Sequence, residues 1–178
     1  MIKTLFDSKK LNLTLHRLAH QLIENHVGFN NTVIIGIQPR GIYLSDRIVK
    51  LVKEIIGNKP IEYGKIDITF YRDDYHNNNI HIPSDTDIPF SIEDKTVILI
   101  DDVLYTGRTI RSAMDALIDF GRPKKVELLT LIDRRFNREL PIEPDYVGLT
   151  VDTIQTQKVI VYWQEKDGKD EVAMIEKS

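Results

Sequence analysis

The sequence of 178 residues contains no cysteine, which excludes disulfide bridges, cysteine-ligated zinc, iron–sulfur clusters and thiol catalysis. No apolar run approaches the length that a membrane span requires. Residues 1–10 include no long apolar segment, so we expect no signal peptide, no membrane partner and a cytoplasmic location. The 24 basic and 27 acidic residues leave a net charge of −3, which gives no general attraction for nucleic acid.

Helix-like and strand-like segments alternate along the chain. The predicted helices run from about Ser8 to Ile23, from Ile42 to Ile56 and from Thr109 to Phe120. The predicted strands run from Thr32 to Ile37, from Lys65 to Tyr71, from Thr96 to Ile100 and from Val126 to Ile132. Continuous apolar strands are typical of a parallel sheet with both faces covered. The alternation therefore predicts an α/β fold, doubly wound around a mainly parallel sheet, in a single domain of residues 1–178.

The C-terminal segment predicts a β-hairpin with its turn at Asp167-Gly168. The two strands of this hairpin are residues 158–163 and 171–175. Tyr162 and Trp163 are expected to pack in the hairpin rather than to stack on a ligand, because aromatic residues are enriched in strands.

Polar loops follow three of the predicted strands, at residues 36–41, 101–109 and 133–138. Ligands of doubly wound folds bind beyond the carboxyl ends of the strands, so chemistry is expected in these loops. Asp101 and Asp102 end one strand, and a turn with Thr106 and Thr109 then opens a helix. Such a turn directs N–H groups and hydroxyls at a phosphate, while paired carboxylates suit sugar hydroxyls or a hydrated Mg²⁺. Simple capping of the helix is the alternative.

Residues 73–89 form a long stretch without helical or strand periodicity, with three consecutive asparagines and two prolines. A loop of this length inside a compact domain is usually functional or disordered. His76 and His81 lie in it and are expected to be solvated rather than to bind a metal.

The segment Val97-Ile98-Leu99-Ile100-Asp101-Asp102-Val103-Leu104-Tyr105-Thr106-Gly107-Arg108-Thr109 resembles the phosphoribosyl-pyrophosphate (PRPP) signature of type I phosphoribosyltransferases. The chain also resembles the PyrR family of pyrimidine-operon attenuation regulators, which have uracil phosphoribosyltransferase activity. The further stretches that carry this likeness are residues 36–44, 67–74, 138–142 and 145–148. The resemblance implies the type I phosphoribosyltransferase fold with a flexible hood loop over about residues 71–89.

The same resemblance implies an Mg²⁺-dependent pentosyltransferase that converts PRPP and uracil to UMP and pyrophosphate. It also implies a homodimer or a higher assembly. Two alternatives stay open: an RNA-binding regulator that senses UMP or PRPP without catalysis, and phosphoribosyl transfer to another base, such as a purine.

The resemblance assigns PRPP binding to Gln38, Pro39, Arg40, Gly41, Asp101, Asp102, Val103, Leu104, Tyr105, Thr106, Gly107, Arg108 and Thr109. Residues 106–109 would hold the 5′-phosphate. Asp101 and Asp102 would engage the ribose hydroxyls and reach, through water, an Mg²⁺ ion held mainly by the substrate. Residues 38–41 match the family's pyrophosphate loop, in which Arg40 is suited to grip phosphate oxygens. Gln38-Pro39 replaces the usual Lys-Thr, which removes one positive charge and one backbone donor.

The residues expected to act in catalysis are Asp101, Asp102, Arg40 and Arg72. Arg72 precedes the hood loop and would close on pyrophosphate and help to exclude water. A solvated charge cluster at a strand end is the alternative for Arg72.

Asp133 and Arg134 lie at the end of the next strand, where the family places backbone contacts to the base. Arg134 is expected to contact the base at the rim or to serve at the surface. The neighbouring Arg135-Phe136-Asn137 departs from the family's usual Gly-His and is one residue longer.

The resemblance also points to a basic RNA-binding face. His16, Arg17, His20 and Arg138 are the candidate residues, although His16 replaces a hydroxyl. Residues with no positive charge stand where the family commonly has Arg or Lys, namely Asn25, Glu143 and Leu149. Each lost phosphate contact removes a counterion-release contribution, so RNA binding is expected to be weak or lost.

Overall fold

The computed structural model describes residues 2–57, 59–72, 84–154 and 156–176. The helices of this part of the chain are α1 (Ser8–Asn25), α2 (Gly41–Ile55), α3 (Arg108–Leu117) and α4 (Gln164–Asp167). Its strands are β1 (Ile2–Phe6), β2 (Thr32–Ile37), β3 (Tyr63–Ile66), β4 (Thr96–Leu104), β5 (Lys125–Arg135), β6 (Tyr146–Asp152), β7 (Gln157–Tyr162) and β8 (Glu171–Glu176). Short 3₁₀ turns follow α1, β3 and α3, at Val27–Phe29, Thr69–Tyr71 and Ile118–Phe120.

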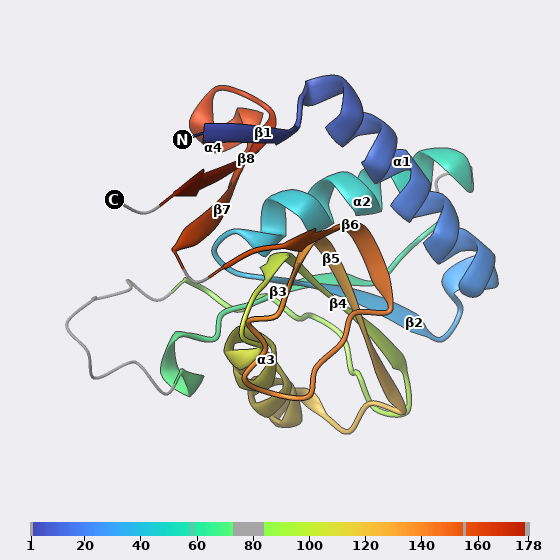
Figure 1. The fold of residues 1–178 in the computed structure, drawn as a ribbon. Coiled ribbons are helices and arrows are strands. Elements are labelled where there is room, and N and C mark those ends of the chain that lie inside the picture. The colour runs from blue at the N-terminus through green and yellow to red at the C-terminus, as the bar shows by residue number, and fades with distance from the viewer. Residues whose placement is uncertain (1, 58, 73–83, 155, 177–178) are drawn as a thin grey trace.

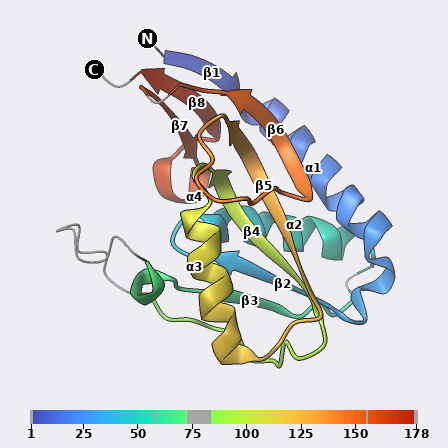
Figure 2. The ribbon, with the colours of Figure 1, turned by 60° about the horizontal axis from the view of Figure 1, so that its bottom comes forward.

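In the described residues, five strands form a sheet in the order β3-β2-β4-β5-β6, and every neighbouring pair is parallel. Helices α1 and α2 cover one face, and α3 covers the other (Figures 1 and 2). The central strands are apolar at successive positions, so alternate residues supply two cores. Ile34 and Ile98 face α1 and α2, whereas Val33 and Val97 face α3. The predicted doubly wound α/β fold is confirmed.

The predicted C-terminal hairpin is also confirmed, because β7 and β8 pair antiparallel around α4. The structure adds a third strand to it: β1 pairs with β8, with Ile2 opposite Ile175 and Thr4 opposite Ala173. This pairing brings the two termini side by side (Figure 1). The partner of β1 lies at the other end of the chain, so no local pattern predicts the pairing.

Several predicted element boundaries differ from the structure, and the ends of β3 and β4 are the ones that bear on the site. The strand expected over residues 65–71 ends at Ile66, because Asp67 takes the next backbone donors. Its carboxylate accepts the N–H of Thr69 at 2.6 Å and that of Ser84 at 2.7 Å. By contrast, β4 continues to Leu104, because its pairing with β5 extends to Leu104, which stands opposite Asp133.

Most of the expected hood loop, residues 73–83 with His76 and His81, lies outside the described residues. The last residues of the expected hood loop, from residue 84 onward, are described, and they are attached to strand β3. Asp87 forms a β-bridge with Lys65, and the two residues exchange N–H to carbonyl bonds of 2.8 Å. Among the described helices, none combines the length and apolar character that crossing a membrane needs.

Candidate active site

The carboxyl ends of β2, β4 and β5 meet at one edge of the parallel sheet. A cavity of about 550 Å³ lies at this edge, between the end of β4 and the start of α3. Its lining residues are Arg72, Asp101, Val103, Leu104, Tyr105, Thr106, Gly107, Arg108, Thr109, Ile110 and Ser112. The structure therefore gathers Arg72, Asp101 and the whole segment 103–109 of the predicted site around one cavity.

Asp101 and Asp102 are neighbours on β4, and only 8% and 7% of their surfaces are exposed. Successive strand residues point to opposite faces, so Asp101 faces the cavity and Asp102 faces Arg40. Burial and the charge of Asp102 raise the pKa of Asp101 well above its usual range, although Arg72 opposes the rise. Burial likewise raises the pKa of Asp102, against the charge of Arg40. Strongly shifted carboxylates in a cleft are typical of functional sites.

The turn after β4 contains a residue whose backbone is in the left-handed conformation. Gly107 has a φ of +94° and caps α3, a backbone conformation that favours glycine. The carbonyl of Thr106 accepts the N–H groups of Glu139 and Leu140 at 3.0 and 3.2 Å. The first N–H groups of a helix have no partner within it and attract anions. The start of α3 therefore presents backbone donors to the cavity, on a turn that the Thr106 carbonyl holds in place.

The loop between β2 and α2 packs directly against β4. A Cβ atom on Gly41 would lie 2.6 Å from the carbonyl oxygen of Ile100 and 3.0 Å from the Cα of Asp101. The peptide bond between Gln38 and Pro39 is cis. The side-chain amide of Gln38 donates to the carbonyl of Asp85 at 2.7 Å. The β2–α2 loop therefore contacts β4 through Gly41 and contacts Asp85, near the end of the expected hood loop, through Gln38.

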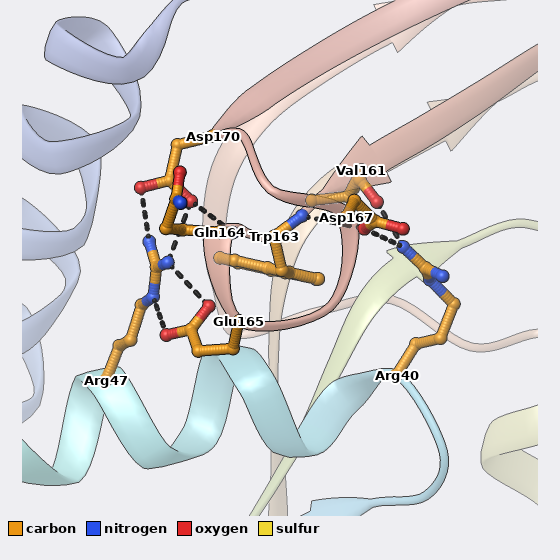
Figure 3. A network of polar contacts seen from close by, with 8 residues as sticks. All are labelled: Arg40, Arg47, Val161, Trp163, Gln164, Glu165, Asp167 and Asp170. Atoms are coloured by element: carbon orange, nitrogen blue, oxygen red, sulfur yellow. Dashed lines mark hydrogen bonds and ion pairs between the residues drawn. The ribbon is translucent and has the colours of Figure 1, made fainter.

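Arg40 lies in the loop directly before α2, and its guanidinium is not among the groups that line the cavity. Its Nε lies 3.5 Å from Oδ2 of Asp102, and its Nη2 lies 3.2 Å from Oδ2 of Asp167. The same Nη2 donates to the carbonyl of Val161 (Figure 3). Arg40 therefore links Asp102 to the C-terminal sheet, and its predicted contact with pyrophosphate stays a prediction.

Arg72 is the last described residue before residue 84, and it lines the same cavity as Asp101. Burial is the main influence on the pKa of Asp101, and the positive charge of Arg72 works against it. A cation at this position faces both the carboxylate and the space beside the α3 turn. The predicted role of Arg72 in closing the site on pyrophosphate stays a prediction.

Asp133 and Arg134 lie near the end of β5, and Asp133 stands opposite Leu104 of β4 in the sheet register. Asp133 lines an adjacent hollow of about 700 Å³ together with the exposed Phe136. Arg134 is buried, and its guanidinium lies 3.9 Å from the centroid of the Tyr105 ring. It donates to the hydroxyl of Thr153 at 3.1 Å and to a further carbonyl. The predicted rim contact through the Arg134 side chain is therefore wrong, because its donors serve internal packing.

The candidate RNA residues are divided by the structure. His16 and His20 are exposed on α1. Arg17, on the same helix, donates to the carbonyls of Val147 and Gly148 at 3.1 and 2.6 Å and so fixes α1 to β6.

Arg138 is likewise engaged within the chain. It donates to the carbonyl of Tyr105 and pairs with Asp133. Glu143 lines the same hollow as Arg138 and adds a negative charge there. Both candidate arginines therefore hold the fold together.

Three groups around Asp102 and Arg40 were not predicted as site residues: the indole of Trp163, the carboxylate of Asp167 and the carbonyl of Val161. All three belong to the C-terminal hairpin and reach the site only through tertiary contacts. Trp163 is fully buried, which confirms the prediction that it packs. The hairpin carries no sequence motif that would mark a role at the site.

The described residues include no group of three or more His, Cys, Asp or Glu side chains that would hold a metal ion alone. Mg²⁺ prefers octahedral oxygen ligands, keeps several waters and commonly binds through one or two carboxylates plus substrate phosphates. The Asp101 and Asp102 carboxylates fit that second arrangement. The donor set therefore suits an Mg²⁺ ion that arrives with a phosphorylated ligand.

Comparison with known proteins defines the class of this chain first. Residues 1–166 match the phosphoribosyl transferase domain family. The hypoxanthine phosphoribosyltransferase of Staphylococcus aureus superposes with a TM-score of 0.72 at 22% identity, over 98% of this chain and 92% of that one. The hypoxanthine-guanine phosphoribosyltransferase of Bacillus anthracis gives a TM-score of 0.72 at 19% identity, over 98% and 99%. At such identities the likeness shows a shared fold.

Closer relatives identify the family within this class. "Bifunctional protein PyrR" of Bacillus subtilis (strain 168) is 46% identical over 175 residues, which are 97% of this chain and 96% of the relative. The protein of the same name from Elusimicrobium minutum (strain Pei191) is 46% identical over 179 residues, 100% and 99% of the two chains. The chain belongs to the PyrR family of phosphoribosyltransferases.

Proposed function

We propose that this protein transfers the phosphoribosyl group of PRPP to uracil and releases pyrophosphate and UMP. The observation that carries the proposal is the cavity of about 550 Å³ between β4 and α3. It joins a buried carboxylate, an anion-binding helix start and a cation in one space. A phosphorylated sugar with a second anionic group needs this combination of partners.

The 5′-phosphate of PRPP would bind at the start of α3. The N–H groups of the turn at residues 106–109 and the hydroxyls of Thr106 and Thr109 are the donors available there. The helix dipole adds to the attraction. The bonds from the Thr106 carbonyl to Glu139 and Leu140 fix the turn before the ligand arrives, so little ordering remains to be done on binding.

Asp101 and Asp102 would accept hydrogen bonds from the ribose hydroxyls. As the bond from the anomeric carbon to pyrophosphate breaks, the ribose gains oxocarbenium character, and these carboxylates would stabilise the positive charge. Their buried position makes this effect strong, because the local dielectric is low. A covalent nucleophile is not needed for such a transfer.

The leaving pyrophosphate would be stabilised by Arg72 from the cavity wall and by Arg40 from the β2–α2 loop. Arg40 lies 3.5 Å from Asp102 and would divide its charge between that carboxylate and the leaving group. When bound with PRPP, Mg²⁺ would neutralise phosphate charge, and Asp101 and Asp102 would reach the ion through water.

The acceptor base would enter beside the end of β5, where Asp133 stands opposite Leu104 of β4. Uracil is the acceptor that membership of the PyrR family favours. Neither the turn nor the carboxylates choose among bases, so a purine is the competing acceptor. Incubation with PRPP, Mg²⁺ and equal concentrations of uracil, cytosine, adenine, guanine and hypoxanthine tests the choice. UMP as the main product supports the proposal, and a purine nucleotide as the main product overturns it.

We also propose that specific RNA binding is weak or lost in this chain. Arg17 and Arg138 are engaged in internal contacts, and Glu143 lies near Arg138. With a net charge of −3, no general positive field replaces those contacts. A regulator that binds leader RNA tightly without catalysis is the alternative, and an RNA titration separates the two.

A further inference from the structure

Arg138 contacts the walls of two neighbouring hollows at the carboxyl edge of the sheet. Tyr105 and Thr106 line the cavity of about 550 Å³, whereas Asp133 and Arg138 itself line the adjacent hollow of about 700 Å³. The pairing between β4 and β5 ends where Leu104 stands opposite Asp133. Beyond this pair the sheet no longer holds the two strands together, so their further residues need other contacts.

The guanidinium of Arg138 supplies such a contact. Its Nη1 donates to the carbonyl of Tyr105, the residue that follows Leu104, and its Nη2 donates to Oδ1 of Asp133. The Arg138 side chain is 21% exposed and that of Asp133 is 12% exposed. Charges this far removed from solvent are screened much less than a surface pair. A planar guanidinium with two acceptors on different strands is restricted to one orientation.

The chain reverses its direction between Asp133 and Arg138. Phe136 lies in this reversal with a φ of +69°, a left-handed conformation that is uncommon for an aromatic residue. The side-chain amide of Asn137 holds the reversal by donating to the carbonyl of Thr153 at 2.7 Å. A strained backbone of this kind persists only where the surrounding contacts determine it. The reversal brings Arg138 back to Asp133, five residues earlier.

The chain after Arg138 runs along the turn that opens α3. The carbonyl of Thr106 accepts the N–H groups of Glu139 and Leu140 at 3.0 and 3.2 Å. A Cβ atom on Gly107 would lie 3.4 Å from the Cβ of Leu140, so the two segments are in van der Waals contact. Backbone bonds therefore support the turn itself, and the side chain of Arg138 adds a link from the turn to β5.

The ring of Tyr105 is held from β5 as well. The guanidinium of Arg134 lies 3.9 Å from the centroid of this ring, a stacking arrangement that arginine favours. Arg134 is fixed in turn by bonds of 3.1 Å to the hydroxyl of Thr153 and 2.7 Å to the carbonyl of Gln157. Tyr105 is therefore joined to β5 at its ring through Arg134, and at its carbonyl through Arg138.

We propose that Arg138 is a positioning residue, which holds the turn that binds the 5′-phosphate at a fixed distance from the base side of the site at Asp133. Transfer requires the anomeric carbon of PRPP and the attacking nitrogen of the base to meet in one geometry, and small misplacements are costly. Arg138 acts on this geometry through Tyr105 and Asp133. The inference rests on the proposed function for its catalytic effect, whereas the double bonding of the guanidinium is independent of it.

The catalytic effect is tested with Arg138→Lys, which keeps the charge but lacks the planar fork that joins two acceptors. We expect kcat for transfer to uracil to fall about tenfold. The dissociation constant of PRPP with Mg²⁺ should stay within about threefold, because backbone bonds still hold the turn. Wild-type kcat in a folded variant, or a loss confined to PRPP affinity, would contradict the inference.

Arg135→Lys is the matched control for this change. Arg135 lies on the same strand and pairs with Asp152 at 2.8 Å, but more than half of each side chain is exposed. Exposed ion pairs contribute little. We therefore expect kcat of the Arg135 variant to stay within about twofold of wild type.

A double-variant cycle tests whether Arg138 acts through Asp133. We expect Asp133→Asn to lower kcat, and the combination with Arg138→Lys to be about as slow as the slower single variant, because both changes break one link. The exposed pair of Arg135 and Asp152 provides the control cycle. Losses that multiply independently in the Arg138 cycle would overturn the inference.

The bonding of the guanidinium is tested by NMR of arginine side chains in the full-length protein without substrate. The signals of Arg138 are those that Arg138→Lys removes. We expect slow rotation of this guanidinium with separate Nη signals, faster rotation in Asp133→Asn, and no change in Asp152→Asn. Free rotation of the Arg138 group in the wild type would overturn the inference.

The measurements separate the two proposals. If the wild-type protein transfers phosphoribose to no base but the Arg138 guanidinium is restricted, the proposed function fails and the bonding stands. If transfer to uracil is normal but the guanidinium rotates freely, the inference fails and the proposed function stands. If Arg138→Lys does not fold, Asp133→Asn decides: an unchanged kcat with unchanged guanidinium signals would overturn the inference.

Discussion

The backbones of Gly41 and Asp101 lie so close together that position 41 has no room for a side chain. A Cβ atom on Gly41 would lie 3.0 Å from the Cα of Asp101 and 2.6 Å from the carbonyl oxygen of the preceding Ile100. Gly41 is the first residue of α2, and Asp101 belongs to β4. This contact sets the distance between the β2–α2 loop and the carboxylates, and therefore the width of the site.

Gly41→Ala tests that relationship. The added methyl group must push the loop away from β4, and overpacking of this kind costs about 1–3 kcal/mol. We expect a lower melting temperature and a loss of phosphoribosyl transfer of at least about tenfold, since small displacements of catalytic groups are costly.

Gly57→Ala is the control for this change. Its φ of +77° makes alanine unfavourable there, by about 1–2 kcal/mol, but nothing lies within 4 Å of its added Cβ. It should lower stability and leave the transfer rate near that of wild type. Equal rates in the Gly41 and Gly57 variants would show that the close contact does not shape the site.

Asp101→Asn is expected to make the protein more stable at neutral pH. Burial and the neighbouring charge of Asp102 raise the pKa of Asp101, so the folded state holds the ionised form poorly. Asparagine removes that penalty. The stability that the variant gains over wild type is therefore full at high pH and shrinks as the pH falls through the raised pKa of Asp101 in the folded state. It vanishes below the ordinary carboxyl pKa of about 4.

Thermal unfolding from pH 4 to pH 8 measures this dependence. The exposed Asp115→Asn on α3 is the control, and such surface changes alter stability by no more than about 0.5 kcal/mol. A melting temperature for Asp101→Asn below that of wild type at pH 8 would show that the ionised carboxylate is favourable in the fold.

The effect of Glu127→Gln on stability should have the opposite sign: we expect a loss of stability at neutral pH that becomes smaller as the pH falls. Burial alone would raise the pKa of Glu127, but hydrogen bonds from Lys125, Tyr146 and His26 outweigh it and hold the pKa below its usual value. The nearest approaches to its carboxylate are 2.6, 2.8 and 2.8 Å. The stabilisation is present above the unfolded-state pKa and is lost as pH falls through the folded-state pKa.

Urea unfolding at pH 7 and pH 4 measures the loss. We expect Glu127→Gln to cost about 1–3 kcal/mol of unfolding free energy at pH 7 and clearly less at pH 4. Transfer activity per folded molecule should not change, because the cluster lies away from the carboxyl edge of the sheet. A constant difference between wild type and variant at both pH values would contradict the linkage.

RNA binding provides a test of the proposed loss of regulation. Filter binding with pyrimidine-operon leader RNA, at near-physiological salt and with UMP present, should give only weak binding that a scrambled RNA matches. Arg17→Ala should lower stability, because it removes two bonds to the carbonyls of Val147 and Gly148, and should change RNA binding little. Nanomolar, sequence-specific binding would refute the proposed loss and support the regulator.

The elements that local sequence determines were predictable. Continuous apolar runs predicted the parallel core, because a strand buried on both faces needs apolar residues at every position. The run that ends in Asp101 and Asp102 and leads to Gly107 marked the cavity. Such features depend on residues close together in the chain, so pattern and spacing reveal them.

Contacts between distant segments were not predictable. Arg40 was expected to contact the pyrophosphate of the substrate, and the sequence did not reveal its contacts within the protein, the carbonyl of Val161 and the carboxylate of Asp167. Arg134 was expected at a rim or at the surface, yet it is buried against the ring of Tyr105 and donates to the hydroxyl of Thr153. In each case the sequence marked the charged residue, but its partners lie far away along the chain. Only the folded structure shows which groups it contacts.

The most direct test of the proposed function is the initial rate of UMP formation from PRPP, Mg²⁺ and uracil. It is measured for the wild-type protein and for the double variant Asp101→Asn with Asp102→Asn. We predict transfer by the wild type and a fall of at least about a hundredfold in the variant, which corresponds to about 2.7 kcal/mol in the barrier. No UMP from the wild type, or a near-normal rate in the folded variant, would contradict the proposal.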